Sequence, residues 1–233
     1  MINDKSVLAI IPARGGSKGV PRKNLRHFNN KSLLAHTIHG ALQSQFIDRV
    51  IVSSDDADII AEAKNAGADV PFVRPVELAS DTSPAWEATI HALENLPHYD
   101  YVVLLQVTTP LRETSDIDGC IEFCLSNDAD ACVTVAESPA NPYWIYSLDE
   151  NNQMIKVIPG EVPLRRQDSP VAYVLNGAVY IARSDWYLQH KTFLTDETIG
   201  FVMSPDKSLD IDTEFDFKLL EVYAAHQNSE TVA

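Results

Sequence analysis

The chain has 233 residues, of which 45% are apolar, so it is long enough for one globular domain with a sizeable core. Its formal net charge of −15 argues against a nucleic-acid partner, because a strongly acidic protein repels phosphate backbones. No apolar run reaches the ~20 residues of a membrane-spanning helix and no signal-peptide pattern opens the sequence, so we expect a cytoplasmic protein with no membrane partner.

The first expected element is a short apolar run, Val7 to Ile11, which is typical of a buried β-strand bounded by a turn. The segment that follows, Ile11 to Asn24, reads I-P-A-R-G-G-S-K-G-V-P-R-K-N. Its glycines allow backbone N–H groups to approach an anion closely. It fits neither the G-x-x-x-x-G-K-[ST] nor the G-x-G-x-x-G phosphate-binding pattern.

Positive charge is concentrated in and just after this glycine-rich loop. Five of the chain's 18 Lys and Arg residues lie there: Arg14, Lys18, Arg22, Lys23 and Arg26. A glycine-rich cationic loop at the end of a strand is where open α/β proteins bind phosphates. A solvated basic connection is the alternative, but the coincidence of strand end, glycines and cations favours a small phosphorylated ligand.

Helix and strand patterns alternate along the rest of the chain. Helical spacing of apolar residues predicts helices at 32–44, 56–66, 83–96, 117–125 and 214–226. Strands are expected at 49–53, Val70 to Val73, 101–106, 131–135, 177–182 and 199–203. This order predicts an α/β protein with a single domain, residues 1–233, in which helices cover both faces of a mostly parallel sheet.

One segment, Pro139 to Ala172, does not fit the alternation. It holds five of the chain's 13 prolines together with several apolar side chains: Tyr143, Trp144, Ile145, Tyr146, Ile155, Val157 and Ile158. Proline keeps a segment out of a central sheet, and a solvated loop would be less apolar. We therefore expect a protruding arm that contacts a second copy, because closed two-fold homodimers are the commonest assembly.

The motif D-I-D-T, Asp210 to Thr213, precedes the last predicted helix. In an extended chain residues two apart point to the same face, so the carboxylates of Asp210 and Asp212 can converge. Two such oxygen ligands suit Mg²⁺ that is shared with substrate phosphates. The equally supported alternative is that Asp212 or Thr213 only caps the helix.

Three further segments hold candidate binding residues. They are L-Q-V-T-T-P-L-R at Leu105 to Arg112, R-P-V-E-L-A-S-D-T at Arg74 to Thr82, and R-Q at Arg166 followed by N-G-A-V-Y-I at Asn176 to Ile181. The first lies at the carboxyl end of a predicted strand, on the ligand side of such sheets. An ordinary turn explains it equally simply, and an exposed arginine is the simplest interpretation of Arg74.

Together these motifs resemble those of the acylneuraminate cytidylyltransferases, the CMP-N-acetylneuraminic acid synthetase family. The similarity runs from Val7 to the helix after Thr213, and the first loop departs from the A-R-x-x-S-T-R-L-P-x-K form of the related CMP-KDO synthetases. It implies a three-layer α/β/α fold of the nucleotide-diphospho-sugar transferase type. It also implies transfer of CMP from CTP to the anomeric hydroxyl of a nonulosonic acid, with N-acetylneuraminic acid as the expected sugar and pyrophosphate as the second product.

The resemblance also implies roles for individual residues. Nucleotide binding falls to Arg14, Ser17, Lys18, Lys23, Asn24 and Arg74, where Arg74 reads the N3 and O2 acceptors of cytosine. Sugar binding falls to Gln106, Arg166, Asn176 and Tyr180, with Arg166 meeting the sugar carboxylate. The implied catalytic residues are Lys23, Arg14 and Asp212, and the implied ligands of Mg²⁺ are Asp210 and Asp212.

Two alternatives stay open. The first is the same reaction on a legionaminic, pseudaminic or KDO-type acid. The second is a nucleotide-sugar binding protein without turnover, against which the presence of both Asp210 and Asp212 argues, because binding alone needs fewer carboxylates near an anion. The resembled family is dimeric through an arm at the position of Pro139 to Ala172, which agrees with the expected homodimer.

Overall fold

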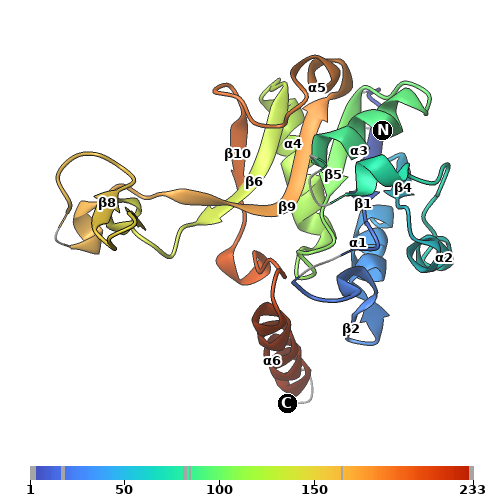
Figure 1. Cartoon of the computed structure of the whole chain (residues 1–233). Helices are drawn as coiled ribbons and strands as arrows, with labels where there is room; N and C mark the ends of the chain where they lie inside the picture. Colours follow the sequence, from blue (N-terminus) through green and yellow to red (C-terminus); the bar gives the residue numbers. More distant parts are fainter. Residues whose placement is uncertain (1–3, 17–18, 81–82, 84, 164, 231–233) are drawn as a thin grey trace.

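The computed structural model describes residues 4–16, 19–80, 83, 85–163 and 165–230. Within this part, six strands form a central sheet in the order β10-β6-β9-β5-β1-β4 (Figure 1). Their bounds are β1 Val7–Pro12, β4 Arg49–Ser53, β5 Tyr101–Leu105, β6 Ala131–Glu137, β9 Tyr173–Arg183 and β10 Ile199–Val202. Strand β9 runs antiparallel to both neighbours and the other pairs are parallel, which confirms the mostly parallel sheet.

Helices cover both faces of this sheet. Their bounds are α1 Leu33–Leu42, α2 Ala57–Asn65, α3 Ala85–Glu94, α4 Thr114–Ser126, α5 Ser184–His190 and α6 Glu214–Glu230. Alternate residues of β1 belong to two different cores, as expected for a strand buried on both sides. Val7 and Ile11 pack with α1, α2 and α4, whereas Leu8 and Ile10 pack with α3 and α5. The three-layer α/β/α architecture is therefore confirmed.

Two helices begin where the sequence predicts because a polar side chain caps each of them. The hydroxyl of Ser32 accepts a hydrogen bond from the backbone N–H of Ala35 at 3.0 Å, at the start of α1. The carboxylate of Asp56 accepts from the N–H groups of Asp58 and Ile59 at 2.9 and 3.0 Å, at the start of α2. Such caps satisfy N–H groups that have no partner inside the helix.

One expected strand is absent, and one helix was not anticipated. The predicted strand Val70 to Val73 is irregular, and only a single bridge between Ile51 and Asp69 joins this region to β4. Pro71 lies inside the stretch and has no N–H to donate to a ladder, which accounts for the failure. Helix α5 was not predicted at all, since it has only seven residues, Ser184–His190, too few for a clear helical period.

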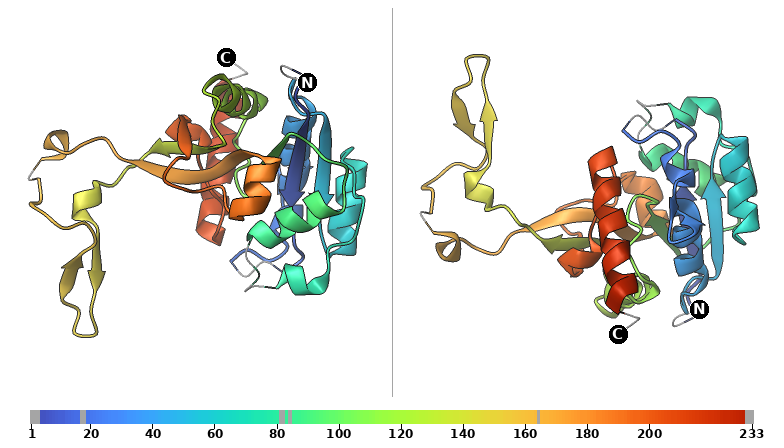
Figure 2. Two further views of the ribbon diagram at one scale, coloured as in Figure 1. Left: turned by 90° about the horizontal axis from the view of Figure 1, so that it is seen from above. Right: turned by 90° about the horizontal axis from the view of Figure 1, so that it is seen from below.

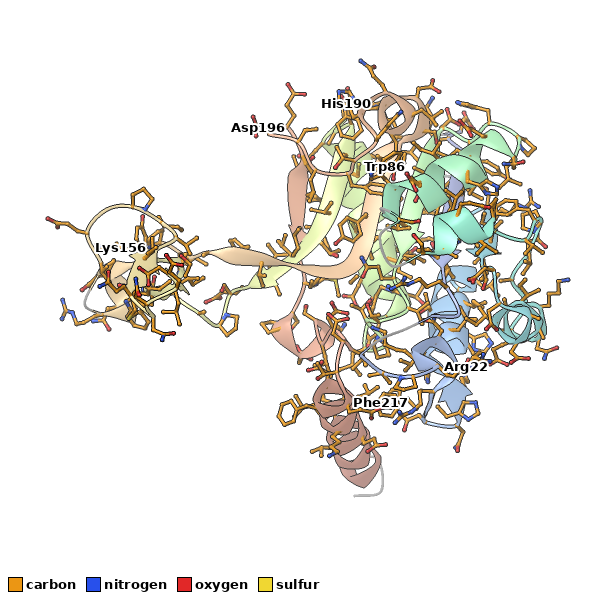
Figure 3. The ribbon with its side chains drawn as sticks, viewed as in Figure 1. Arg22, Trp86, Lys156, His190, Asp196 and Phe217 are labelled. Atoms are coloured by element: carbon orange, nitrogen blue, oxygen red, sulfur yellow. The ribbon has the colours of Figure 1, made fainter. Side chains whose placement is uncertain are left out.

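The predicted arm corresponds to residues 138–172, which connect β6 to β9 and project from the body of the protein (Figures 1 and 2). At its tip, β7 Tyr146–Leu148 and β8 Met154–Lys156 form an antiparallel hairpin of their own, separate from the central sheet. Figure 3 marks Lys156 at this end. As expected, the proline-rich segment stays out of the main sheet.

Smaller elements complete the described part of the chain. A short hairpin pairs β2 His27–Phe28 with β3 Lys31–Ser32 beside the first loop. The 3-10 helices are η1 Lys23–Leu25, η2 Val76–Ala79, η3 Pro142–Trp144, η4 Arg166–Asp168 and η5 Pro205–Lys207. None of the helices among the described residues combines the length and apolar character needed to cross a bilayer.

Candidate active site

The predicted binding segments meet at one edge of the sheet, where the parallel strands β1, β4 and β5 have their carboxyl ends. The glycine-rich loop follows β1, and segment 106–112 follows β5. The D-I-D-T motif joins them because the backbone N–H of Ile211 donates to the carbonyl of Thr108 at 2.8 Å. Ligands of open α/β sheets bind at this edge, so the arrangement agrees with the sequence analysis.

Two adjacent cavities open at this edge. The Arg74 cavity, of about 290 Å³, is lined in part by Arg14, Asn24, Arg74, Ser80, Gln106 and Thr108. The Lys23 cavity, of about 300 Å³, is lined in part by Arg14, Gly19, Lys23, Asn24, Thr108 and Asp212. Since Arg14, Asn24 and Thr108 line both, an extended ligand such as a nucleotide can run from one cavity into the other.

Close backbone contacts fix the described part of the glycine-rich loop. The N–H of Gly15 donates to the carboxylate of Asp55 at 3.1 Å, and the side-chain amide of Asn24 donates to the carbonyl of Arg14 at 2.9 Å. A Cβ at Gly19 would lie only 1.9 Å from the carbonyl oxygen of Asp212. Position 19 therefore requires glycine, because the loop passes directly against the backbone of the D-I-D-T motif.

Lys23 is the cation that contacts this motif. Its ammonium group donates to the carbonyl of Ile211 at 2.6 Å and to the carboxylate of Asp212 at 3.1 Å. The side chain is largely buried, with 13% of its surface exposed, whereas that of Asp212 is 72% exposed. Lys23 is thus held at the boundary between the glycine-rich loop and the paired carboxylates.

Two other cations of the region hold the loop in place instead of facing the cavities. Arg22 forms ion pairs with Asp56 and Asp58 at the start of α2, and Figure 3 shows it on that side of the molecule. Arg26 pairs with Glu214 at 2.9 Å and lies over the ring of Phe217 in α6. Among the described cations of this region, Arg14 and Lys23 therefore line the cavities, whereas Arg22 and Arg26 anchor the loop.

Three predicted site residues cannot be placed in this geometry. Ser17 and Lys18, assigned to nucleotide binding, lie outside the described residues. For Arg166, assigned to the sugar carboxylate, the backbone forms part of η4 but the side chain lies outside the described part. These three assignments remain predictions from the sequence.

The structure separates the capping interpretation of D-I-D-T from the metal-binding one. The hydroxyl of Thr213 accepts from the N–H of Asp216 at 3.3 Å, and the carboxylate of Asp216 accepts from the N–H groups of Thr213 and Asp212 at 2.7 and 3.1 Å. Thr213 and Asp216 thus cap α6 reciprocally. The side chains of Asp210 and Asp212 take no part in this cap.

Asp210 has the properties of a ligand for a hard cation. Its Oδ1 is buried and has no hydrogen-bond partner among the described residues. Burial raises the pKa of Asp210; a hydrogen bond from Thr108 and the charge of Lys23 oppose this rise, and the nearby charge of Asp212 adds to it. Two mutually repelling carboxylates, one with an unpartnered oxygen, fit a divalent cation that takes its other ligands from phosphates and water.

No larger cluster strengthens or competes with this pair. Among the described residues, no group of three or more His, Cys, Asp or Glu is arranged to hold a metal ion. Asp210 and Asp212 therefore remain the candidate carboxylate ligands for the metal ion predicted from the sequence.

Arg74 is buried, not exposed, and it lines the cavity named after it. Its Nε donates to the hydroxyl of Ser53 at 3.0 Å, and its Nη2 donates to the Ser53 carbonyl. Burial lowers the pKa of Arg74 to about 10; the charge of Asp55 opposes this shift and that of Arg14 adds to it, so the guanidinium stays charged near neutral pH. Nη1 forms no hydrogen bond within the described part of the chain and is the donor left for a ligand.

Gln106 and Tyr180 line a third cavity, of about 220 Å³, together with Trp86, Tyr187, Lys191 and Phe193. We call it the aromatic cavity; Figure 3 marks Trp86. It shares Leu104 and Gln106 with the Arg74 cavity, so the two are neighbours. Burial raises the pKa of Tyr180, and the charge of Asp210 adds to this rise.

Asn176, the fourth predicted sugar ligand, is already engaged within the chain. Its amide donates to the hydroxyl of Ser208 at 2.9 Å, and its oxygen accepts from Thr134 and from the N–H of Ala178 at 2.7 and 3.2 Å. It lines a cavity of about 530 Å³ at the base of the arm. Through these hydrogen bonds Asn176 connects β9 to Thr134 in β6 and to Ser208.

Comparison with known proteins identifies the family of the chain. The family model described as cytidylyltransferase matches residues 8–229. The chain belongs to the cytidylyltransferase family. The matched residues include the strands and the loops that form the site, from β1 to the D-I-D-T motif.

Curated relatives divide by the sugar acid in their names. An N-acylneuraminate cytidylyltransferase of Escherichia coli is 33% identical over 226 residues, which are 97% of this chain and 54% of that protein. A CMP-N,N'-diacetyllegionaminic acid synthase of Legionella pneumophila is 35% identical, covering 92% of this chain and 94% of that one. A pseudaminic acid cytidylyltransferase of Campylobacter jejuni is 34% identical with the same coverage. The chain spans about half the length of several N-acylneuraminate relatives.

Solved structures confirm the fold of this cytidylyltransferase chain. A CMP:2-keto-3-deoxy-manno-octonic acid synthetase complexed with CTP superposes with a TM-score of 0.72 at 16% identity, covering 95% of this chain and 99% of that one. A 4-diphosphocytidyl-2C-methyl-D-erythritol synthase of Anaerococcus prevotii gives a TM-score of 0.65 at 16% identity, covering 94% and 98%. At these identities the likeness establishes the α/β/α fold.

Several residues of the site escaped the sequence analysis. Thr108 lines two cavities, and its carbonyl binds the backbone of the D-I-D-T motif. It belongs to the L-Q-V-T-T-P-L-R motif, and its position directly after a predicted strand was the signal that could have identified it. Ser53, which binds Arg74, ends a predicted strand. Trp86 and Phe193 come from α3 and from the segment after α5, and no local pattern connects them.

Proposed function

We propose that the chain transfers CMP from CTP to the anomeric hydroxyl of a nonulosonic acid and releases pyrophosphate. The observation that carries the proposal is that Arg14, Lys23 and Asp212 line two adjacent cavities, with Asp210 near enough to Lys23 and Asp212 for their charges to act on its carboxylate. The names of the relatives support the reaction, with N-acetylneuraminic acid as the first candidate sugar and legionaminic or pseudaminic acid as alternatives.

In this proposal the nucleotide occupies both cavities. The base lies in the Arg74 cavity, where Nη1 of Arg74 donates to the N3 or O2 acceptor of cytosine. The triphosphate extends into the Lys23 cavity, where Arg14 and Lys23 neutralise its charge. The contacts of Gly15, Gly19 and Asn24 hold the described parts of the loop in position beside the proposed phosphate site.

The reaction is a single in-line displacement. The anomeric oxygen attacks the α-phosphorus, forms a new P–O bond and loses its proton, while the bond to pyrophosphate breaks. Such transfers depend mainly on positioning and on charge neutralisation. Mg²⁺, held by Asp210 and Asp212, would supply positive charge shared with the substrate phosphates. Lys23, which touches Asp212, lies where it can stabilise the charge that develops during transfer.

The sugar acid lies beside the nucleotide, with Gln106 between them, because Gln106 lines both the Arg74 cavity and the aromatic cavity. Aromatic rings such as Trp86 and Phe193 suit the apolar faces and acyl groups of a nonulosonic acid. Tyr180 lines the same cavity, and the charge of Asp210 adds to the rise that burial causes in its pKa.

Turnover is the direct test of the proposed function. The protein is incubated with CTP, Mg²⁺ and each of N-acetylneuraminic, legionaminic, pseudaminic and KDO acids, and pyrophosphate is measured. We expect release only when nucleotide, metal and one nonulosonic acid are all present. CTP binding without release for any of these sugars would overturn the proposal and favour a nucleotide-sugar binding protein.

Base selectivity tests the position of Arg74. Because uracil carries a hydrogen on N3 where cytosine has an acceptor, an arginine donor favours CTP over UTP. We expect Arg74→Ala to reduce the ratio of kcat/KM for CTP to that for UTP by roughly 10-fold, the value of one charged hydrogen bond. Arg183→Ala, which removes an arginine paired with Asp128 at the far end of β9, is the control. An unchanged ratio would remove Arg74 from base recognition.

We further propose a cytoplasmic homodimer assembled through the arm. Support comes from the exposed apolar side chains there, among them Trp144, Leu148, Ile155 and Val157. Arg165 and Arg166 lie on the arm, and in a two-fold dimer each arm can supply them to the other copy's sugar site.

Trp144→Asp tests this assembly. Trp144 is 47% exposed, so a charge there should weaken an apolar interface without opening the core. We expect light scattering at micromolar concentration to show the wild type at twice the chain mass of 25.8 kDa and the variant shifted toward that mass, with reduced turnover. Val222→Asp, an exposed apolar position on α6, is the control. A fully active wild-type monomer would contradict the arm-mediated dimer.

A further inference from the structure

The hydrogen-bonded ladder between β5 and β9 ends at the candidate active site. Its last pair in this direction is Leu105 with Val179. The next two facing carbonyls, those of Gln106 and Ala178, are both bound by one side chain. Nη1 of Arg112 donates to the Gln106 carbonyl at 3.1 Å and to the Ala178 carbonyl at 2.6 Å. The guanidinium therefore continues the connection between the strands where the ladder stops.

The same nitrogen also fixes the turn that follows β5. It donates to the hydroxyl of Thr109 at 3.1 Å, and the backbone N–H of Arg112 donates to the Thr109 carbonyl at 3.3 Å. Thr108, the preceding residue, holds the D-I-D-T motif through its carbonyl. A shift of Arg112 would consequently be transmitted both to Gln106 and to the segment that carries the paired carboxylates.

Fold stability alone does not account for an arginine at this position. Arg112 is 8% exposed, its Nε is buried without a partner among the described residues, and no carboxylate there forms a hydrogen bond with it. Burial lowers the pKa of Arg112 to about 10, opposed only by the charge of Asp116. Taking a charge that has no carboxylate partner out of water costs free energy, which the hydrogen bonds of this guanidinium must offset. The arginine is better explained by the geometry that it imposes.

That geometry concerns the side chain of Gln106. Gly177 has a φ of +71°, and a Cβ there would lie 3.1 Å from Oε1 of Gln106. The Gln106 amide is thus packed against the backbone of β9 one residue before Ala178, where Arg112 binds. The distance between segment 106–112 and β9 therefore sets where the amide lies between the Arg74 cavity and the aromatic cavity.

We propose that Arg112 is a positioning residue, which pins Gln106 to β9 and thereby aligns the sugar acid with the nucleotide. The inference rests on the proposed function, because it takes the aromatic cavity to be the sugar site. It assigns Arg112 no contact with either substrate. Its effect should accordingly appear in sugar alignment more than in CTP affinity.

The test compares Arg112→Met, Arg112→Lys and Arg183→Met. The methionine variant has a similar length but no donors, lysine restores a charged donor, and Arg183→Met removes an arginine at the opposite end of β9. For Arg112→Met we expect a rise in the sugar KM and a fall in kcat, each by roughly 10-fold or more, with the CTP dissociation constant changed less than about 2-fold. Arg112→Lys should recover part of both, and Arg183→Met should leave both near wild type.

Amide hydrogen exchange supplies a readout that needs no turnover. In Arg112→Met, and less strongly in Arg112→Lys, we expect faster exchange at 105–110 and 176–180 than elsewhere in the chain. Equal weakening of CTP and sugar, the same losses in Arg183→Met, or unchanged exchange in these two segments would each overturn the inference. If the wild type turns over none of the sugars, the proposed function fails, and exchange still decides whether Arg112 pins Gln106. If Arg112→Met does not fold, Arg112→Lys decides in the same way.

Discussion

Asp210→Asn and Asp212→Asn are each expected to lower kcat by at least about 100-fold at saturating CTP, sugar acid and Mg²⁺. Asparagine keeps the size of the side chain and removes the charge that a hard cation requires. We expect the larger fall in kcat for Asp210→Asn, because Oδ1 of Asp210 is buried and forms no hydrogen bond with any other described residue. Pyrophosphate release measured across a range of Mg²⁺ concentrations gives the result.

Asp216→Asn is the matched control, since it changes a carboxylate four residues after Asp212 that caps α6 and lines neither the Arg74 cavity nor the Lys23 cavity. We expect it to lower stability by roughly 1 kcal/mol, the usual value of a helix cap, and to keep most of the turnover. Thermal unfolding of all three variants separates the two effects. Near-normal kcat in Asp210→Asn or Asp212→Asn would show that the carboxylate concerned is no metal ligand.

The parts of the fold that the sequence predicts are those encoded by local patterns. Apolar runs specify β1, β4 and β5, and Ser32 and Asp56 mark the starts of α1 and α2 with their own side chains. Because parallel strands place their carboxyl ends at one edge, correct strand assignments were enough to bring the glycine-rich loop and Gln106 together. The D-I-D-T motif joins them through a contact between loops, the hydrogen bond from Ile211 to Thr108. The position of the site followed from topology in this way.

The contacts that define the site's chemistry connect residues far apart in the sequence. Arg74 and Ser53 are 21 positions apart, and their hydrogen bond helps to hold the arginine in a buried position. The sequence had suggested an exposed side chain, whereas the structure leaves one nitrogen of this buried side chain, Nη1, to bind a ligand. Lys23 meets Asp212 across 189 positions. A period or a motif carries no information on such pairs, because they depend on how loops pack after the sheet has formed.

The D-I-D-T motif shows the same limit at short range. From the sequence, Asp212 and Thr213 were equal candidates for the cap of α6, since both residue types serve in that role. The decision came from Asp216, whose carboxylate reaches back to the N–H groups of Asp212 and Thr213 and completes a reciprocal cap. Once Thr213 and Asp216 fill that role, the charges of Asp210 and Asp212 need another explanation.

Lys23→Ala is expected to lower kcat by roughly 10²- to 10³-fold, the usual loss when one preorganised donor to transition-state charge is removed. CTP affinity should fall by less than about 10-fold, because Arg14 still lines both cavities and contributes to ground-state binding. Single-turnover kinetics and nucleotide titration measure the two quantities separately. A rise in KM for CTP with kcat unchanged would place Lys23 in ground-state binding alone.

The ion pair of Lys23 with Asp212 adds a second consequence that needs no catalysis. With the ammonium 3.1 Å from a carboxylate oxygen, Lys23 competes with a divalent cation for Asp212 while no nucleotide is bound. Lys23→Ala should therefore bind Mn²⁺ more tightly than the wild type in the absence of CTP, as measured by electron paramagnetic resonance. Arg49→Ala is the control, because Arg49 is paired with Asp69 at the amino end of β4 and should change neither kcat nor Mn²⁺ affinity. Equal Mn²⁺ affinity in wild type and Lys23→Ala would mean that the lysine does not compete with the metal ion for Asp212 and acts on the phosphates alone.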